Sequence, residues 1–302
     1  MNKKKILITT DSDSCGMGFW MTYALNNYTE DYEAIHLIGK EHPLKFPYEY
    51  LFSTLNNFTI KSIIDSIDFI QLMHTNYKDR IGELYFPKSK IWSMYHTGFH
   101  YRNCPASQDK EDTKRNLKIV FATPDLCRFN NKLIPLKYPI DSESLLSRKP
   151  VSKDLVSHSP SDPNMKNSLL IENSNIPKIV EGYGYIFKST REISWKESLA
   201  LKERSLIYID HLYEPYNSFG ISSVEASLLG AIPIGMGNYF NVENCPYINV
   251  NTIEELEYYV DYYLSDYADW HYKSLECKEW SGNNFSLRST ASVLKENYDR
   301  LF

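Results

Sequence analysis

A glycine and two serines lie between a predicted buried strand and a predicted helix, where backbone N–H groups can bind an anion. The strand is expected at 206–209 and the helix at 224–229, and Gly220, Ser222 and Ser223 lie in the loop before the helix. The first turn of a helix leaves N–H groups without intrahelical partners, and the helix dipole favours negative charge there. This arrangement predicts a binding site for an anion such as a diphosphate.

Glu225 falls in the first turn of the same helix, on the face that can turn back towards the loop. A carboxylate there can accept hydrogen bonds from the two hydroxyls of a ribose, as an acidic residue does in dinucleotide-binding folds. The alternative is a capping box, in which Ser222 or Ser223 caps the helix and Glu225 binds back to the cap without any ligand. For an isolated Ser-x-x-Glu motif the capping box is the better explanation, and it is the longer stretch 210–238 that favours a ligand site.

The elements that must position these residues are predicted from the apolar pattern. Short apolar runs, some separated by helical segments, indicate two successive series of buried parallel strands. The first series is expected at 3–9, 33–38, 67–72, 90–94 and 118–122, and the second at 154–157, 179–180, 205–209, 231–234 and 247–250. A polar stretch at 133–153, interrupted by prolines, is typical of a linker, and 285–302 has the spacing of a terminal helix.

The composition of the 302 residues is that of a soluble globular protein, with 42% hydrophobic and 24% charged residues. The net charge of −5 argues against a dedicated nucleic-acid binder. Five scattered cysteines without C-x-x-C spacing indicate neither a zinc site nor a disulfide framework. No apolar run approaches the roughly 18–20 residues that span a bilayer, and no signal peptide is recognisable. We therefore expect a cytoplasmic protein.

The stretch 205–238 resembles the C-terminal signature of retaining GT-B glycosyltransferases of the family 4-like group. That signature is a Glu, seven residues that include Phe-Gly, then Glu-Ala, followed shortly by Gly-x-Pro-Val-Ile. The matching residues are Phe219-Gly220, Glu225-Ala226 and Gly230-Ala231-Ile232-Pro233-Ile234. The resemblance implies that Glu225 binds the donor ribose and that Gly220, Ile221, Ser222 and Ser223 bind the donor diphosphate.

The first Glu of the signature is replaced by Asn217, with Glu214 close by as a less favoured substitute. The resemblance places that position near the donor sugar, where Asn217 can donate and accept hydrogen bonds but supplies no negative charge. The segment 158–168 resembles the family's His-x-Pro-Ser…Lys-Gly-Thr loop, which gives Lys166 the role of neutralising the diphosphate. Taken alone, Lys166 would be a solvated loop lysine.

Two residues of the segment 158–168 depart from the family's pattern. Asn167 stands where the family has Gly, and Ser161 stands where many members have Arg. Arg102 of the first domain is the expected replacement for the missing cation.

The loop after the predicted strand at 90–94 resembles the family's His-x-Gly-Ser-x-x-Arg loop. This resemblance implies that His96 faces the donor sugar and that Arg102 contacts the acceptor or a phosphate, whereas a buried structural histidine is the alternative for His96. The loop with Gly16, Met17 and Gly18 resembles the N-terminal glycine loop of the family. It implies diphosphate binding by Gly16 and acceptor or phosphate binding by Met17 and Gly18.

The implied fold is α/β of the GT-B type, with two Rossmann-like domains facing each other across a cleft. The expected boundaries are 1–145 for the acceptor domain, 146–284 for the donor domain, and 285–302 for a helix that crosses back. The implied activity is metal-independent, retaining transfer of a sugar from a nucleoside diphosphate sugar, with a UDP-sugar expected, to an acceptor hydroxyl. His96 and Asn217 are then the residues nearest the reacting sugar, and no cofactor other than the donor is required.

Three rivals share this fold or its ligand. One is a phage- or virus-type enzyme that glycosylates modified bases in DNA, for which a basic face is needed; the candidates are Lys40, Lys45, Lys61, Lys110, Lys114 and Arg115. The second is a non-catalytic nucleotide-sugar-binding subunit, motivated by Asn217 and Ser161. The third is a non-hydrolysing sugar epimerase, which would need further carboxylates. The acceptor stays open between a saccharide, a small molecule and DNA.

Overall fold

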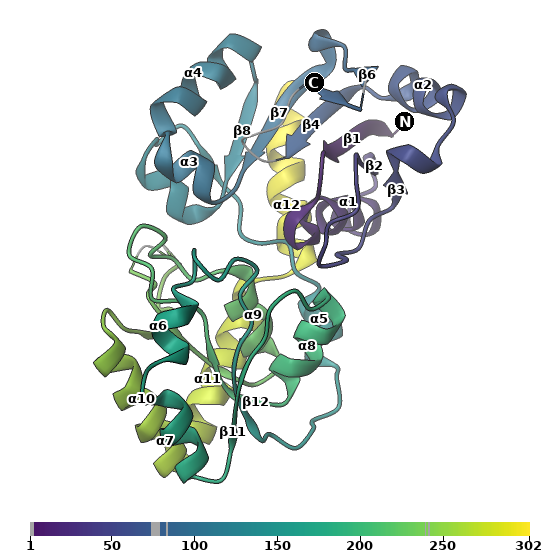
Figure 1. Ribbon diagram of the computed structural model, residues 1–302. Helices are drawn as coiled ribbons and strands as arrows, with labels where there is room; N and C mark the ends of the chain where they lie inside the picture. The colour runs from purple at the N-terminus through teal and green to yellow at the C-terminus, as the bar shows by residue number, and fades with distance from the viewer. Residues whose placement is uncertain (1–2, 74–78, 83, 239, 241) are drawn as a thin grey trace. The chain divides into compact units, whose positions relative to one another are not determined.

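The computed structural model describes residues 3–73, 79–82, 84–238, 240 and 242–302. The chain divides into two compact units, each built around one parallel sheet (Figure 1). The first unit comprises 1–140 and 286–302, and the second comprises 141–285.

The sheet of the first unit has seven parallel strands in the order β3-β2-β1-β4-β7-β8-β9. They are β1 (Lys4–Thr10), β2 (Tyr32–Ile38), β3 (Tyr50–Leu51), β4 (Phe69–Met73), β7 (Ile91–His96), β8 (Ile119–Ala122) and β9 (Ile134–Pro135). Ile6, Leu7 and Ile8 of β1 are fully buried, as expected for a central parallel strand covered on both faces. The strand order reverses between β1 and β4, which is the topological switch point of this sheet.

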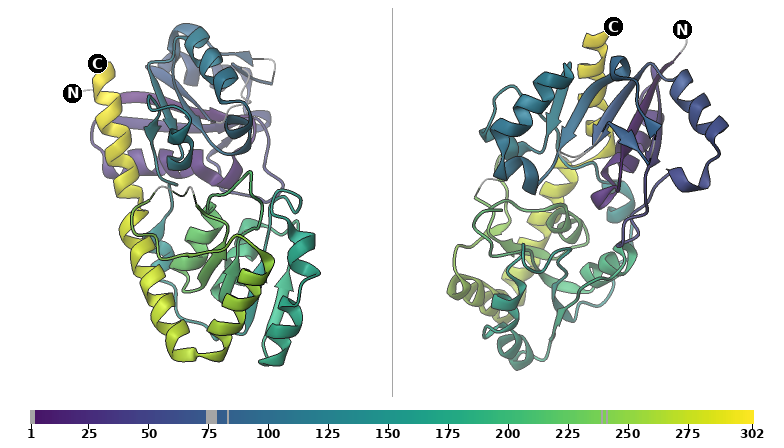
Figure 2. Two further views of the ribbon diagram at one scale, coloured as in Figure 1. Left: turned by 90° about the vertical axis from the view of Figure 1, so that its left-hand side faces the viewer. Right: turned by 45° about the horizontal axis from the view of Figure 1, so that its top comes forward.

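Helices cover this sheet and include the last helix of the chain. They are α1 (Met17–Tyr28), α2 (Asn57–Ser66), α3 (Phe99–Asn103), α4 (Pro105–Arg115) and α12 (Leu287–Tyr298), and a small antiparallel pair is formed by β5 (Arg80–Ile81) and β6 (Leu84–Tyr85). Leu287 and Ala291 of α12 pack against Ala24 of α1, and the Tyr298 ring lies 5.0 Å from that of Phe69. Both views of Figure 2 show α12, in yellow, alongside the strands of this sheet. The predicted terminal helix is therefore confirmed.

The sheet of the second unit has five parallel strands in the order β11-β10-β12-β13-β14. They are β10 (Leu155–His158), β11 (Ile186–Ser189), β12 (Ser205–Ile209), β13 (Ile232–Gly235) and β14 (Ile248–Asn249). This is the flavodoxin-like order, with its switch point between β10 and β12.

Seven helices are described in this unit, and α9 follows the anion-binding loop of the sequence prediction. They are α5 (Ser142–Leu146), α6 (Ser168–Glu172), α7 (Ile176–Gly182), α8 (Trp195–Glu203), α9 (Ile221–Leu228), α10 (Ile253–Ser265) and α11 (Tyr267–Asn284). Gly230, with φ +82°, ends α9, and the Ala231 N–H donates to Ala226 O at 2.9 Å. A left-handed residue and this backward bond form a Schellman-type cap, so the predicted helix end at Gly230 is confirmed.

One predicted strand is wrong. Residues 179–180 lie in α7, and the strand of this region is β11, whose residues alternate between exposed and partly buried instead of forming an apolar run. The stretch 133–153, predicted as a linker, contains the division between the two units and also β9 and α5. The Asp141 side chain caps α5 by accepting the Ser144 N–H at 3.1 Å, so the polar run 141–144 encodes a helix start. Among the helices of the described residues, none has the length and apolar character to cross a membrane.

Candidate functional site

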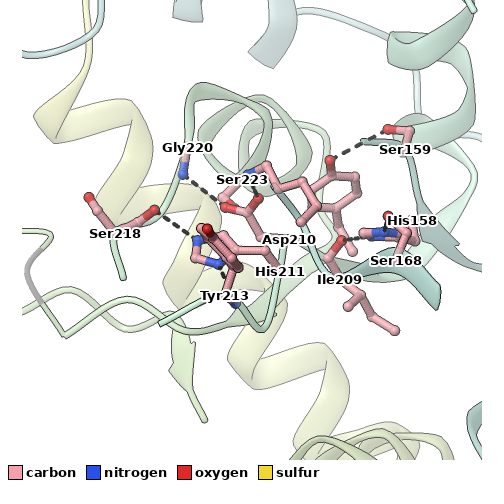
Figure 3. A network of polar contacts seen from close by, with 12 residues as sticks. His158, Ser159, Ser168, Ile209, Asp210, His211, Tyr213, Ser218, Gly220 and Ser223 are labelled. Carbon is pink, nitrogen blue, oxygen red and sulfur yellow. Dashed lines mark hydrogen bonds and ion pairs between the residues drawn. The ribbon is translucent and has the colours of Figure 1, made fainter. Parts of the chain in front are cut away.

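The switch point of the second unit brings polar side chains together at the carboxyl ends of β10 and β12 (Figure 3). His158 ends β10, and Asp210 follows β12 directly. In open parallel sheets this is the place where ligands bind. The loop with Lys166 and the start of α9 both reach it.

Asp210 is the centre of this cluster. Its Oδ2 accepts hydrogen bonds from the Gly220 N–H and the Ser223 hydroxyl, each at 2.8 Å. Its Oδ1 forms an ion pair with Nζ of Lys166. Three residues that the sequence predicts to bind diphosphate, Lys166, Gly220 and Ser223, are thus brought together by one buried carboxylate.

The charges of this cluster are maintained by the pair itself. Burial alone would lower the pKa of Lys166, but the Asp210 carboxylate together with Tyr216 and Tyr208 outweighs it and raises that pKa above the usual value. Burial would raise the pKa of Asp210, and Lys166 with the Gly220 N–H holds it well below the usual range instead. The Lys166 side chain remains 12% exposed, and its Nζ lies 4.8 Å from the centre of the Tyr216 ring. A cation is therefore kept at an accessible position.

Next to the Lys166 cation, the first turn of α9 supplies backbone N–H donors. Ile221 and Ser222 are the first two helical residues, whose N–H groups have no intrahelical partner by helix geometry. Gly220 is the N-cap, and among the described residues no side chain caps the helix. The capping-box explanation for Ser222, Ser223 and Glu225 is therefore wrong. What remains is an open helix N-terminus beside a lysine, which suits an anion.

The loop before α9 is held by a buried histidine and by Asn217. His211 Nε2 lies 3.1 Å from Ser218 O, and its Nδ1 lies 3.2 Å from the Tyr213 N. Since a carbonyl only accepts and an amide N–H only donates, the ring is protonated on Nε2. Asn217 has φ +39°, is 5% exposed, and accepts the Asn238 N–H on Oδ1 at 2.9 Å. Its amide is used to hold the loop.

The loop after β10 shows why Asn167 can replace the glycine of the resemblance. Asn167 has φ +54°, in the left-handed region, where Asn is tolerated better than most residues other than Gly. Its Nδ2 donates to Leu212 O at 3.1 Å. His158 lies beneath this loop, with Nδ1 2.9 Å from Ile209 O and Nε2 2.8 Å from Ser168 Oγ. These contacts fix the loop that carries Lys166.

Glu225 lies in α9 with its carboxylate bound within the second unit. Oε2 accepts from Lys202 Nζ at 2.6 Å, and Oε1 accepts from the Trp195 Nε1–H at 2.7 Å. Both partners come from α8, and Glu225 is 5% exposed. The sequence pattern did not reveal either partner.

The predicted residues of the loop after β7 are buried in the first unit. His96 is fully buried, with Nε2 2.6 Å from Oδ2 of Asp112 in α4. Arg102 is 8% exposed and donates to Asp125 Oδ2 from Nε at 2.9 Å and from an Nη at 2.6 Å. Each of these two side chains therefore has a carboxylate partner from its own unit.

The glycine loop of the first unit is closely packed. Gly16 has φ +64°, and Met17, the first residue of α1, is 4% exposed. A Cβ on Gly18 would lie 2.7 Å from Nε2 of His36, so glycine is needed there for a close approach. Packing alone therefore explains the need for glycine at position 18, without any ligand.

Two further observations concern the chemistry available. Across 3–73, 79–82, 84–238, 240 and 242–302, no group of three or more His, Cys, Asp or Glu could hold a metal ion. Sequence reasoning missed Asp112, Asp125, Trp195 and Lys202, because their partners lie 16 to 30 positions away along the chain. For Asp210 a signal existed, since a carboxylate directly after a buried strand lies at the ligand-binding edge of a parallel sheet.

The architecture is shared with solved structures of low sequence identity. An alpha-glucosyltransferase in complex with UDP and a 13-mer DNA has a TM-score of 0.66 at 11% identity, over 98% of each chain. Anabaena HepE in complex with UDP and glucose has a TM-score of 0.66 at 10% identity, over 98% of this chain and 100% of that one. A glycosyltransferase from Rickettsia africae has 0.60 at 13% identity, over 99% of each chain.

No protein-family model and no curated protein matches the sequence. The structural likenesses nevertheless extend over nearly the whole chain, and the two parallel sheets account for them. The chain has the GT-B fold, built from two Rossmann-like domains.

Proposed function

We propose that this protein is a glycosyltransferase that takes its sugar from a UDP-sugar. The observation that carries the proposal is the cluster of Lys166, Asp210 and the N-terminus of α9 at the switch point of the second unit. It offers one cation and open N–H groups to a diphosphate. The solved structures of an alpha-glucosyltransferase and of HepE, which share this fold, each hold UDP.

In the proposed reaction the donor's anomeric carbon loses its bond to the diphosphate oxygen and gains a bond to the acceptor oxygen. Negative charge grows on the departing diphosphate, and Lys166 with the Ile221 and Ser222 N–H groups stabilises it without a metal ion. The acceptor proton passes to a leaving phosphate oxygen on the same face of the sugar, so the anomeric configuration is retained. No protein nucleophile and no cofactor besides the donor takes part.

The remaining roles follow from the family resemblance. The resemblance assigns the donor ribose to Glu225 and the donor sugar to His96 and Asn217, although His96 is fully buried against Asp112 and the Asn217 amide holds the loop before α9. Gly16 lies at the diphosphate. The acceptor or a phosphate is contacted by Met17, Gly18 and Arg102.

A second candidate specifies the acceptor as DNA, and the charge distribution favours it. Residues 1–140 and 286–302 carry 21 Lys and Arg against 17 Asp and Glu, whereas 141–285 carry 12 against 21. In the first unit Lys118, Arg128 and Lys132 line an open pocket of about 800 Å³, together with Asp109 and Asp112. Three of the six basic residues expected to form a DNA face are partly neutralised: Lys40 by Asp11, Lys114 by Glu111 and Arg115 by Asp79. With three basic and two acidic residues, the pocket is a candidate surface beside Lys45, Lys61 and Lys110.

Salt-dependent binding tests the DNA candidate. Each phosphate neutralised contributes a slope of about −0.9 to log K against log salt for duplex DNA. Replacing Lys118 and Lys132 together by Ala should flatten that slope by about 2, while Lys178→Ala, at an exposed position of α7, should leave it unchanged. Binding without salt dependence would exclude this acceptor.

A thermal-shift panel with UDP, GDP, ADP and dTDP tests the donor site. A nucleotide at about 100 times its Kd adds about 2.7 kcal/mol to the stability of the protein that binds it. We expect UDP to raise the Tm of the parent and of the control Glu181→Ala, and to leave Glu225→Ala unshifted. No shift with any nucleotide would overturn the donor assignment.

Product analysis tests the reaction itself. With a UDP-sugar and an acceptor, release of UDP together with a new glycoside of unchanged anomeric configuration supports the proposal. A changed UDP-sugar without an acceptor would indicate an epimerase, and binding without turnover would indicate a binding subunit.

A further inference from the structure

The ion pair between Lys202 and Glu225 is buried at both ends. The side chain of Lys202 is 1% exposed and that of Glu225 is 7% exposed, with 2.6 Å between Nζ and Oε2. Removing two charges from water is costly, and apolar residues of similar volume often stabilise a core equally well or better. Stability is therefore a weak explanation for this buried pair. A requirement for a charged group at a fixed place is a better one.

The second oxygen of the same carboxylate is fixed by a neutral donor. The Trp195 Nε1–H donates to Oε1 of Glu225 at 2.7 Å, and Trp195 is the first residue of α8. Lys202 lies in the last turn of the same helix. One helix therefore holds both oxygens of Glu225, and the carboxylate has no freedom to change its rotamer without losing two hydrogen bonds.

The Lys202 side chain itself packs against the sheet. Nζ of Lys202 lies 5.4 Å from the centre of the Tyr208 ring in β12, and the Ser159 hydroxyl lies 3.5 Å from the Tyr208 hydroxyl. Ser159 directly follows β10. The chain of contacts thus joins α8, α9 and both strands at the switch point, which is a rigid base for a ligand-binding carboxylate.

An ionised carboxylate accepts about four hydrogen bonds, and Lys202 and Trp195 use two of these acceptor positions. Within the part of the chain that the structure describes, one acceptor position remains on each oxygen. Two adjacent acceptors at this spacing suit two neighbouring hydroxyls, such as the 2′ and 3′ hydroxyls of a ribose.

We propose that Lys202 and Trp195 are positioning residues that hold Glu225 for a vicinal diol, and that they make the second unit select ribonucleotides over 2′-deoxyribonucleotides. The inference rests on the proposed nucleotide site and adds the two residues that set its sugar specificity. Neither residue needs to touch the ligand.

Isothermal titration with UDP and 2′-deoxyUDP tests the inference. A hydrogen bond to a charged group contributes a factor of about 10 or more in affinity, so the parent should bind UDP at least about tenfold more tightly than 2′-deoxyUDP. Lys202→Met should bring this ratio close to one by weakening UDP alone. Lys196→Met, an exposed lysine of the same helix, is the matched control and should keep the parent ratio.

The affinity for 2′-deoxyUDP reports whether each variant is folded. If Lys202→Met does not fold, Trp195→Phe, at a partly exposed position, carries the test and should reduce the ratio by about threefold or more. An unchanged ratio in the folded variants, or a parent ratio near one, overturns the inference and leaves the nucleotide site standing. If the parent binds neither nucleotide, the proposed function and the inference both fail.

Discussion

In each unit a carboxylate near the end of a strand binds the start of a helix. The basic side chain beside this carboxylate is a lysine in the second unit and a histidine in the first. Asp210 of the second unit holds Gly220 and Ser223 and faces Lys166. In the first unit, Asp13 accepts the Phe19 N–H of α1 at 3.2 Å, and its Oδ2 lies 3.3 Å from Nε2 of His36.

The two basic side chains differ in charge at neutral pH. Burial lowers the pKa of the fully buried His36 in spite of Asp13, so His36 is neutral, whereas Lys166 stays charged and partly exposed. A similar strand–loop–helix arrangement therefore ends at a buried, neutral histidine in the first unit and presents a partly exposed lysine cation in the second. We place the donor diphosphate in the second unit for that reason.

Removing the carboxylate should show the largest difference between the units. Asp210→Asn leaves Lys166 without its counter-charge, and breaking a buried pair in this way costs about 3–5 kcal/mol. Asp13→Asn should cost about 1 kcal/mol, because it weakens one hydrogen bond and leaves no charge behind. Hydrogen exchange of the β12 and β1 amides measures the two losses separately. Equal losses would contradict the distinction.

Removing the cation should affect ligand binding by about 10- to 100-fold. Lys166→Ala deletes a charge-assisted contact to the diphosphate, which is worth about 1.5–3 kcal/mol. Lys40→Ala, in the strand-end region of the first unit, should change UDP affinity by less than about twofold, because its side chain is 70% exposed and screened. Isothermal titration with UDP measures both. A larger effect at Lys40 would move the donor site to the first unit.

Alanine substitutions at Gly18 and Gly220 compare how tightly the starts of α1 and α9 are packed. In Gly18→Ala the new Cβ would meet Nε2 of His36 at 2.7 Å, which should cost about 1–3 kcal/mol. In Gly220→Ala the nearest atom, Nζ of Lys166, lies at 3.5 Å, and φ is −86°, so the cost should stay below about 0.5 kcal/mol. Thermal unfolding of both variants gives the comparison, and a larger loss at Gly220 would show that its site is the more tightly packed.

Acidification should give the smallest effect. Burial lowers the pKa of His36 and also that of His158 in the second unit. The unfolded chain takes up protons below about pH 6.5 while the folded protein does not, so both units should lose stability as the pH falls below that value. His36→Gln should remove this dependence from the first unit only. Opening free energies of the β2 and β10 amides across this range measure it, and a persistent dependence in β2 would assign the effect to another group.

The sequence predicted much of the second unit because local chemistry determines it. The strand 205–209 is a continuous apolar run, and Gly230 is the left-handed residue that ends α9. Asn167 adopts a positive φ, which Asn tolerates better than most residues other than Gly. Such features depend on a few neighbouring residues, so their pattern is visible in the chain.

What the sequence could not reveal depends on partners far apart in the chain. Glu225 was predicted to bind the donor ribose, but its partners Lys202 and Trp195 lie 23 and 30 positions before it. His96 was expected to face the donor sugar, and the structure places it fully buried against Asp112. The alternating, half-exposed strand β11 was missed because edge strands lack the apolar run of a central strand.

Hydrogen exchange with and without saturating UDP tests the central claim most directly. The account predicts that UDP protects the amides of 220–223 and of the Lys166 loop more strongly than any amide of the first unit, and that Lys166→Ala reduces this protection. Protection confined to the glycine loop at 15–18, or no protection at either place, would contradict the assignment of the donor site to the second unit.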